Sequence, residues 1–309
     1  MSLFRDFFLA LSTHARLRQL VTTFPLSRRV ARRFVAGETL DEAIRVVEKL
    51  NAQNLDVTFD VLGESVTNET EARAAKDEYL RALDAIAAHR VRSHVSVKLT
   101  QMGLDLSHDL CLKNMREIVS KARALGSFAR IDMEDSRHTQ ATLNVYKTLR
   151  EEFDNVGIVI QAYLYRSEQD VNALVAMNAR VRLCKGAYKE SPEIAFPDKR
   201  DVDANYVKLA QLFLEANGAR ARAHLALATH DEKIIRWARA LIAQNNVPRE
   251  RYEFQMLYGI RSDLQRKLAA ENYPVRVYVP YGTHWYPYFM RRLAERPANV
   301  VFLISNLFR

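Results

Sequence analysis

The chain has 309 residues, 48% of them hydrophobic, with 46 basic and 37 acidic residues and a net charge of +9. This hydrophobic fraction supports a packed core, while nine glycines and eight prolines are too few for long linkers or disorder. The basic residues are interspersed with acidic ones, which argues against nucleic acid binding. No compositional break divides the chain, so we expect one domain over residues 1–309, with N-terminal helices in 1–54 and the main fold in 55–309.

The N-terminal segment has only a brief apolar run, at residues 7–11, flanked by charges. The run is too short for a signal peptide or a membrane span, and it favours an amphipathic helix that covers the core. Transient contact of such a helix with a membrane surface is the alternative. The two cysteines, Cys111 and Cys184, have no partners at metal-ligand spacing. We therefore expect reduced packing residues, no metal site, and a cytoplasmic protein or one peripheral at the inner face of the membrane.

Strand and helix patterns alternate along the rest of the chain. Helical spacing separates eight predicted strands, at residues 55–61, 94–99, 128–133, 156–163, 180–185, 224–229, 252–257 and 275–279. This alternation indicates parallel pairing and, at this strand count, a closed (βα)8 barrel. An open doubly wound sheet is the alternative, but no Gly-x-Gly-x-x-Gly turn follows the first strand.

Polar side chains share one face of most predicted strands. The apolar face of each strand should pack under the helices, so the polar face should point into the barrel. Buried charges are costly unless they pair or bind a ligand, and barrel enzymes build their sites at the C-terminal ends of the strands. A structural ion pair explains any single one of these residues equally well, but their convergence on one mouth favours a site. The inward set is Asp56, Thr58, Asp60, Ser96, Lys98, Arg130, Asp132, Gln161, Arg182, Gln255 and Tyr278.

A helix is predicted after the last strand, with Pro287 in its first turn and Pro297 at its end. One of its faces is apolar, and a second face carries two adjacent arginines that suit a carboxylate or a phosphate. The alternative is a solvated face with ion pairs within the helix. The apolar face holds Trp285, Phe289 and Leu293, and the second face holds Tyr288, Arg291, Arg292 and Glu295.

These motifs resemble proline dehydrogenase. The resemblance runs in order from about residue 55 to the C-terminus, and the stretch from Tyr288 to Pro297 is its most specific part. The chain is similar to the free-standing bacterial form, because it is too short to hold the aldehyde dehydrogenase and DNA-binding regions of the bifunctional proline utilisation proteins. The matching segments are Lys98-Leu-Thr, Arg130-Ile-Asp-Met-Glu134, Gln161-Ala-Tyr163, Arg182 through Tyr188, Thr229-His230 and Tyr278 through Asn299.

The resemblance implies a distorted TIM-type (βα)8 barrel with extra N-terminal helices, whose last barrel helix lies over the C-terminal mouth. It implies noncovalent FAD and oxidation of L-proline to 1-pyrroline-5-carboxylate, with electrons passed to a membrane quinone. It also implies pyrroline-5-carboxylate dehydrogenase as a functional partner. A second enzyme hypothesis is another flavin-dependent barrel oxidoreductase with an anionic substrate, either hydroxyproline or a folate. A basic ligand-binding or nucleic-acid-binding module without catalysis is the hypothesis from a different class.

Residue roles follow from the resemblance by position. Arg182 would stabilise negative charge on the flavin, and Asp132 would pair with Lys98 or orient it. The substrate contacts would be Lys98, Leu257, Tyr278, Arg291, Arg292 and Glu295. The FAD contacts would be Met133, Gln161, Arg182, Lys185, Gly186, Ala187, Thr229 and His230.

Overall fold

The computed structural model describes residues 31–63, 65–217 and 222–295. Its centre is a closed barrel of parallel strands that follow one another in chain order. The strands are β1 (Asp56–Val61), β2 (Ser93–Val97), β3 (Ala129–Ile131), β4 (Val156–Gln161), β5 (Arg180–Cys184), β6 (His224–Ala228), β7 (Tyr252–Leu257) and β8 (Val275–Tyr281). The barrel closes where β1 pairs with β8, from Asp56 opposite Arg276 to Val61 opposite Tyr281. The predicted (βα)8 barrel is therefore confirmed.

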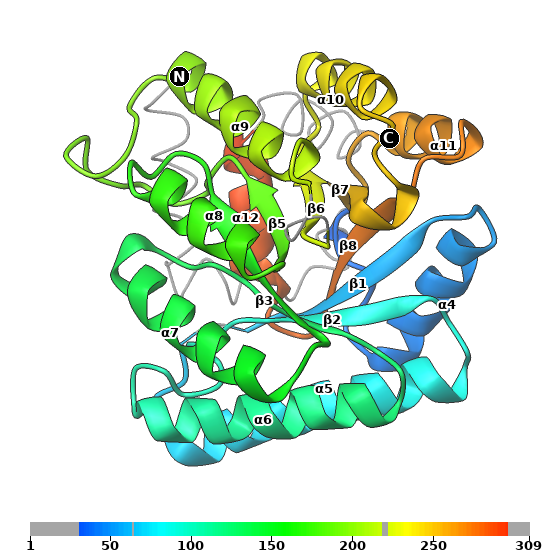
Figure 1. Cartoon of the computed structure of the whole chain (residues 1–309). Coiled ribbons are helices and arrows are strands. Elements are labelled where there is room, and N and C mark those ends of the chain that lie inside the picture. Colours follow the sequence, from blue (N-terminus) through cyan, green and yellow to red (C-terminus); the bar gives the residue numbers. More distant parts are fainter. Residues whose placement is uncertain (1–30, 64, 218–221, 296–309) are drawn as a thin grey trace.

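Helices surround the strands (Figure 1). They are α4 (Leu40–Asn51), α5 (Glu69–Ala88), α6 (His108–Ala124), α7 (Ser136–Glu152), α8 (Ser167–Ala176), α9 (Lys199–Leu214), α10 (Glu232–Gln244), the short 3-10 helix η2 (Arg249–Arg251), α11 (Ser262–Ala270) and α12 (Trp285–Glu295). Figure 1 shows α12 within the ring formed by α4 to α11. N-terminal helices were expected within residues 1–54. Residues 1–30 lie outside the described residues, and α4 is the helix that the structure describes in the remainder of this region.

Local sequence sets where several of these helices begin. Thr39 and Glu42 form a capping box at the start of α4, in which each side chain accepts a hydrogen bond from the other residue's backbone N–H. Asn68 and Ser107 accept hydrogen bonds from backbone N–H groups in the first turns of α5 and α6. These caps satisfy amide groups that have no partner within the helix.

Strand alternation separates an apolar layer from a polar interior. Val57 and Phe59 of β1 are fully buried, and they belong to one large apolar cluster that also contains residues of the outer helices, such as Tyr79. Thr58 and Asp60, on the opposite face of β1, are equally buried but polar. The outer apolar layer therefore holds the barrel together, and the inner face is left for polar contacts.

The last helix packs on the first described segment. Phe34 lies 6.2 Å from Phe289, between ring centroids, and the Trp285 indole N–H donates a hydrogen bond of 3.0 Å to Glu38 Oε1. Trp285 and Phe289 are both 3% exposed, which confirms those two members of the predicted apolar face. The side chain of Leu293 lies outside the described residues. These contacts fix α12 against the segment that precedes α4.

Both cysteines are free thiols, with Cys111 buried and Cys184 half-buried. Within the described ranges, none of the helices has the length and apolar character to span a membrane. The same part of the chain contains no cluster of His, Cys, Asp and Glu suited to a metal ion.

Candidate active site

A cavity of about 680 Å³ lies at the C-terminal ends of the strands. It is lined by residues in or just beyond all eight strands, most of them near the C-terminal ends, and by the helix α12. The predicted site residues that line it are Lys98, Asp132, Met133, Gln161, Arg182, Lys185, Gly186, Ala187, Thr229, His230, Leu257, Tyr278, Arg291 and Arg292. Glu295 is the last residue of α12, but its side chain lies outside the described residues.

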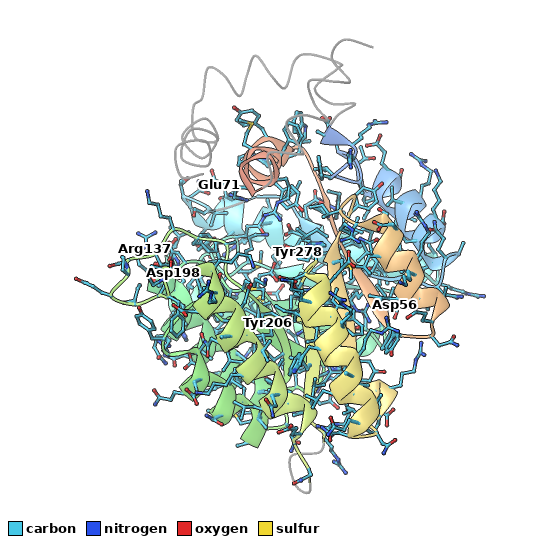
Figure 2. All side chains as sticks on the ribbon, turned by 90° about the horizontal axis from the view of Figure 1, so that it is seen from above. Asp56, Glu71, Arg137, Asp198, Tyr206 and Tyr278 are labelled. Carbon is cyan, nitrogen blue, oxygen red and sulfur yellow. The ribbon has the colours of Figure 1, made fainter. Side chains whose placement is uncertain are left out.

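Asp132 is the centre of a buried hydrogen-bond network on the cavity floor. Its Oδ1 accepts hydrogen bonds from Ser96 Oγ at 2.6 Å and from Arg182 Nη1 at 2.8 Å. Its Oδ2 accepts one from the Tyr278 hydroxyl at 2.7 Å. Burial, followed by the charge of Asp132, raises the pKa of Tyr278 well above its usual value, so the side chain stays a phenol and a donor. Figure 2 shows Tyr278 near the centre of the molecule, with Asp198, which precedes α9, nearer its edge.

Lys98 forms its ion pair with Asp60, at 2.6 Å between Nζ and Oδ1. Of the two roles expected for Asp132, an ion pair with Lys98 is therefore wrong, because Asp132 pairs with Arg182 instead, while an orienting effect on Lys98 stays a prediction. Burial alone would lower the pKa of Lys98, but the carboxylates of Asp60 and Asp132 raise it above its usual value. Lys98 is thus a fixed cation at the cavity wall. The sequence pattern placed Asp60 on the inward face of its strand. Strand alternation does not predict which residue an inward carboxylate pairs with, so the ion pair with Lys98 was missed.

The α12 arginines line the same cavity. Arg292 is 8% exposed, and its guanidinium carbon lies 5.0 Å from the ring centroid of Tyr288, one turn earlier. Arg291 is half-buried and also lines the cavity. Together with Lys98, these side chains place three cations around one space, which is suited to a carboxylate or phosphate.

A second part of the cavity is formed by the segment after β5 and the side chain of Gln161. Gln161 Oε1 accepts a hydrogen bond of 3.3 Å from the backbone N–H of Ala187, and its Nε2 donates one of 2.8 Å to the Glu134 carbonyl. Gly186 has φ of +125°, and a Cβ there would lie 2.5 Å from the ring of Tyr163. Only glycine fits this position, so the backbone runs close beside Tyr163 at the cavity edge.

The segment after β6 completes this part. Lys185 Nζ pairs with Asp203 at 2.5 Å and with Asp231 at 2.9 Å. His230 Nε2 accepts a hydrogen bond of 3.0 Å from the backbone N–H of Leu257, which requires the neutral ring with its proton on Nδ1. Asp231 also lines the cavity. It was not among the predicted site residues, although it directly follows the Thr229-His230 motif.

The cavity suits a large, oxygen-rich ligand such as FAD. Its volume falls within the range of about 300–1,000 Å³ that is usual for ligand sites. Arg182 is 5% exposed, and its Nη2 is buried without a hydrogen-bond partner among the described residues. Because an unsatisfied buried donor is costly, this nitrogen fits an acceptor atom of a bound molecule. Lys199 and Arg261 add positive charge to the lining, and they too were missed by sequence reasoning.

Fold and site together define a class of protein. A closed (βα)8 barrel with a charged, ligand-sized cavity at the C-terminal ends of its strands is the architecture of a barrel enzyme. The model of the proline dehydrogenase family matches residues 43–305, and the chain belongs to this enzyme family.

Individual relatives agree with this assignment. The chain is 44% identical over 305 residues to proline dehydrogenase 1 of Bacillus subtilis (strain 168), and the match covers 99% of each chain. It is 40% identical over 285 residues to proline dehydrogenase of Deinococcus radiodurans, covering 91% of this chain and 90% of that one. Among solved structures, proline utilization A from Bdellovibrio bacteriovorus, inactivated by N-propargylglycine, is similar with a TM-score of 0.81 and 27% identity. That match covers 95% of this chain and 36% of the other.

Proposed function

We propose that this chain oxidises L-proline to 1-pyrroline-5-carboxylate, with FAD as its bound cofactor and a quinone as the electron acceptor. The observation that carries the proposal is the placement of Lys98, Arg291 and Arg292 around one cavity at the C-terminal mouth. Proline dehydrogenases from Bacillus subtilis and Deinococcus radiodurans are similar to nearly the whole chain, which supports the same substrate.

The three cations would hold the proline carboxylate. Guanidinium groups bind a carboxylate through paired hydrogen bonds, and the two adjacent arginines come from one rigid helix. Lys98 is kept charged and in place by Asp60, so it would add a point charge to the same cavity. Glu295 belongs to the same proposed substrate-binding face. The positive surroundings also disfavour a protonated amine, which leaves the nitrogen lone pair available when the C–H bond breaks.

Leu257 and Tyr278 would contact the proline ring. The Tyr278 hydroxyl is fixed by Asp132 at 2.7 Å, and its ring lies 5.1 Å from the guanidinium carbon of Arg182. Tyr278 therefore has one orientation in the cavity. A fixed wall on one side of the substrate limits its rotation, which is how a barrel site gains rate from positioning.

The FAD would be held by Met133, Gln161, Lys185, Gly186, Ala187, Thr229 and His230, together with Arg182. When bound, the flavin supplies the two-electron acceptor that no side chain provides. Arg182 would stabilise negative charge that develops during the reaction, because its Nη2 is buried and has no hydrogen-bond partner within the described ranges. Asp132 would position both Arg182 and Tyr278, and it is the second residue that we assign to catalysis.

We further infer that residues 1–309 form one domain, because α4 and α12 both pack on the same barrel. A membrane quinone as acceptor would require transient contact with a membrane surface, at its inner face for a cytoplasmic protein. The product 1-pyrroline-5-carboxylate would be passed to its dehydrogenase, the functional partner that this chemistry implies.

The test is to mix the purified protein with L-proline in the absence of oxygen and to follow the flavin absorbance. Bleaching by L-proline, and restoration of the colour by a soluble quinone, are the expected results. Reduction by a nicotinamide cofactor in place of proline would favour the folate-type alternative. A colourless protein that does not bind added FAD would refute the cofactor assignment, and with it the proposed reaction.

A further inference from the structure

A second cavity, of about 860 Å³, lies at the opposite, N-terminal end of the barrel. Many of its lining residues stand at the first or second position of a strand, among them Asp56 of β1, His94 of β2 and Arg276 of β8. Figure 2 labels Asp56, which lines this second cavity, and Tyr278, which lines the catalytic cavity, and the two residues lie apart. Three carboxylates line this cavity, against six arginines, which are Arg90, Arg92, Arg123, Arg130, Arg180 and Arg276.

Arg130 is a buried cation within this second cavity. It is 1% exposed, and its Nη1 donates hydrogen bonds to the carbonyls of Arg180 at 3.1 Å and Ile158 at 3.3 Å. Its Nε is buried and has no hydrogen-bond partner among the described residues. Gly157 leaves room for the guanidinium, because a Cβ there would lie 2.5 Å from the Arg180 carbonyl oxygen and 3.1 Å from Arg130 Nη1.

Arg180 brings a second cation to the same place. The guanidinium carbons of Arg130 and Arg180 lie 5.2 Å and 4.8 Å from the ring centroid of Phe128. The Arg180 side chain contacts the Phe128 ring, and no hydrogen bond or ion pair joins it to another residue in the part of the chain that the structure describes. His94, whose ring centroid is 5.1 Å from that of Phe128, has a buried Nε2 that likewise finds no partner there. Two buried nitrogens without a partner, on Arg130 and His94, and the exposed guanidinium of Arg180 therefore lie around one aromatic ring.

The carboxylates of this cavity are committed elsewhere. Asp56 pairs with Arg92 at 2.9 Å and with Arg276 at 3.4 Å, and Glu253 pairs with Arg276 at 2.9 Å. Burial alone would raise the pKa of Glu253, but Arg276, His224 and Arg130 lower it to about 2. The environment is thus strongly positive even after these pairs have formed. Asp154, the third carboxylate, is exposed to water, so it neutralises little of the buried charge.

We propose that the N-terminal end of the barrel binds a small oxyanion of the phosphate class, held by Arg130 and Arg180 with His94 beside them. A phosphate offers oxygens in several directions, and arginine forks bind it through paired, charge-assisted hydrogen bonds. A carboxylate shares this chemistry but presents fewer oxygens and less charge. The site is separate from the catalytic cavity, and the proposal does not depend on which substrate is oxidised there.

The test is calorimetric titration of inorganic phosphate into the purified protein with its cofactor retained, at an ionic strength held constant with chloride. Saturable binding of one phosphate is expected, with weaker binding of acetate. Arg180→Gln should weaken phosphate binding by at least about tenfold, which is the effect of one lost charge-assisted hydrogen bond. Arg180→Glu should abolish the binding.

Arg236→Gln is the matched control, because Arg236 is an exposed arginine on the outer helix α10. It should leave phosphate affinity within about twofold of wild type, as expected for a surface charge far from the ligand. The proposal is overturned if the wild-type protein shows no saturable phosphate binding. It is also overturned if Arg180→Gln binds phosphate as tightly as wild type, because that result would mean that the phosphate binds at the catalytic mouth. An equal loss in Arg236→Gln would also overturn it, since that would indicate general charge attraction. Because Arg180 is exposed, we expect both Arg180 variants to fold, and thermal unfolding provides the check.

Discussion

The hydroxyl of Tyr278 on β8 donates a hydrogen bond of 2.7 Å to Asp132, which follows β3. The other carboxylate oxygen accepts from Arg182 of β5 at 2.8 Å, and the Arg182 guanidinium lies over the Tyr278 ring. Each of the three side chains therefore fixes the other two, although they come from well-separated parts of the chain. Substitutions within this trio should affect geometry as well as charge, and the following variants are chosen to separate the two.

Arg182→Ala should slow flavin reduction more than it weakens proline binding, because the charge that Arg182 stabilises appears during the reaction. Loss of one such electrostatic contact typically costs about 10²–10³ in rate. Arg182→Lys keeps the charge and should recover part of the rate. Stopped-flow measurement of anaerobic bleaching at saturating proline provides the readout. An unchanged bleaching rate in the alanine variant would contradict the assigned role.

Arg291→Met and Arg292→Met should each raise the KM for proline while FAD stays bound. Removing one member of a buried charge pair typically costs about 2–5 kcal/mol. Arg266→Met is the matched control, because it makes the same substitution at an exposed position on α11. Near-normal proline affinity in both α12 variants would mean that these arginines only cover the barrel.

Tyr278→Ser should shift substrate preference toward 4-hydroxyproline. The smaller side chain opens space beside the substrate ring, and a change of this kind alters discrimination by about 1–3 kcal/mol. Tyr278→Phe keeps the ring but removes the hydrogen bond to Asp132, so it separates packing from positioning. The quantity to measure is kcat/KM for proline divided by kcat/KM for 4-hydroxyproline. If that ratio does not fall in the serine variant, Tyr278 does not set the substrate size.

Asp60→Asn should destabilise the protein, because it leaves the Lys98 ammonium buried without its charged partner. Lys98 is 11% exposed and Asp60 1% exposed in their side chains, and breaking a buried pair from one side typically costs about 3–5 kcal/mol. The double variant Asp60→Asn with Lys98→Met removes both charges and should recover part of the loss. Urea unfolding gives the free energies. Equal stability of wild type and Asp60→Asn would show that the pair is screened by water.

His224→Gln should reduce the loss of stability in acid. Burial, in the main, lowers the pKa of His224 to about 3, whereas an unfolded histidine titrates near 6.5. Between these values the unfolded state binds the extra proton, so the free energy of unfolding falls as pH falls from about 6.5, by about 1.4 kcal/mol per pH unit. The glutamine variant lacks this proton and should show a shallower slope between pH 7 and pH 5. Identical slopes would mean that His224 is protonated in the folded protein.

The sequence by itself predicted the barrel, because the alternation of strands and helices is a local pattern that repeats along the chain. It also predicted which face is polar for most of the strands, since side chains alternate strictly in a strand. Strand ends were less accurate. The third strand was expected at 128–133 and spans Ala129–Ile131, while β8 continues two residues past its predicted end to Tyr281. Strand ends depend on pairing with neighbours, which local pattern does not specify.

The tertiary structure alone decided which charges meet. Alternation placed Asp60, Lys98, Asp132 and Arg182 inside the barrel, but the stagger of the strands paired Lys98 with Asp60 and sent Arg182 across to Asp132. Arg130 of β3 and Asp132, which directly follows β3, are only two residues apart, yet they line cavities at opposite ends of the barrel. Ion pairs depend on distances of a few ångströms between strands far apart in sequence, and those distances exist only once the barrel has closed.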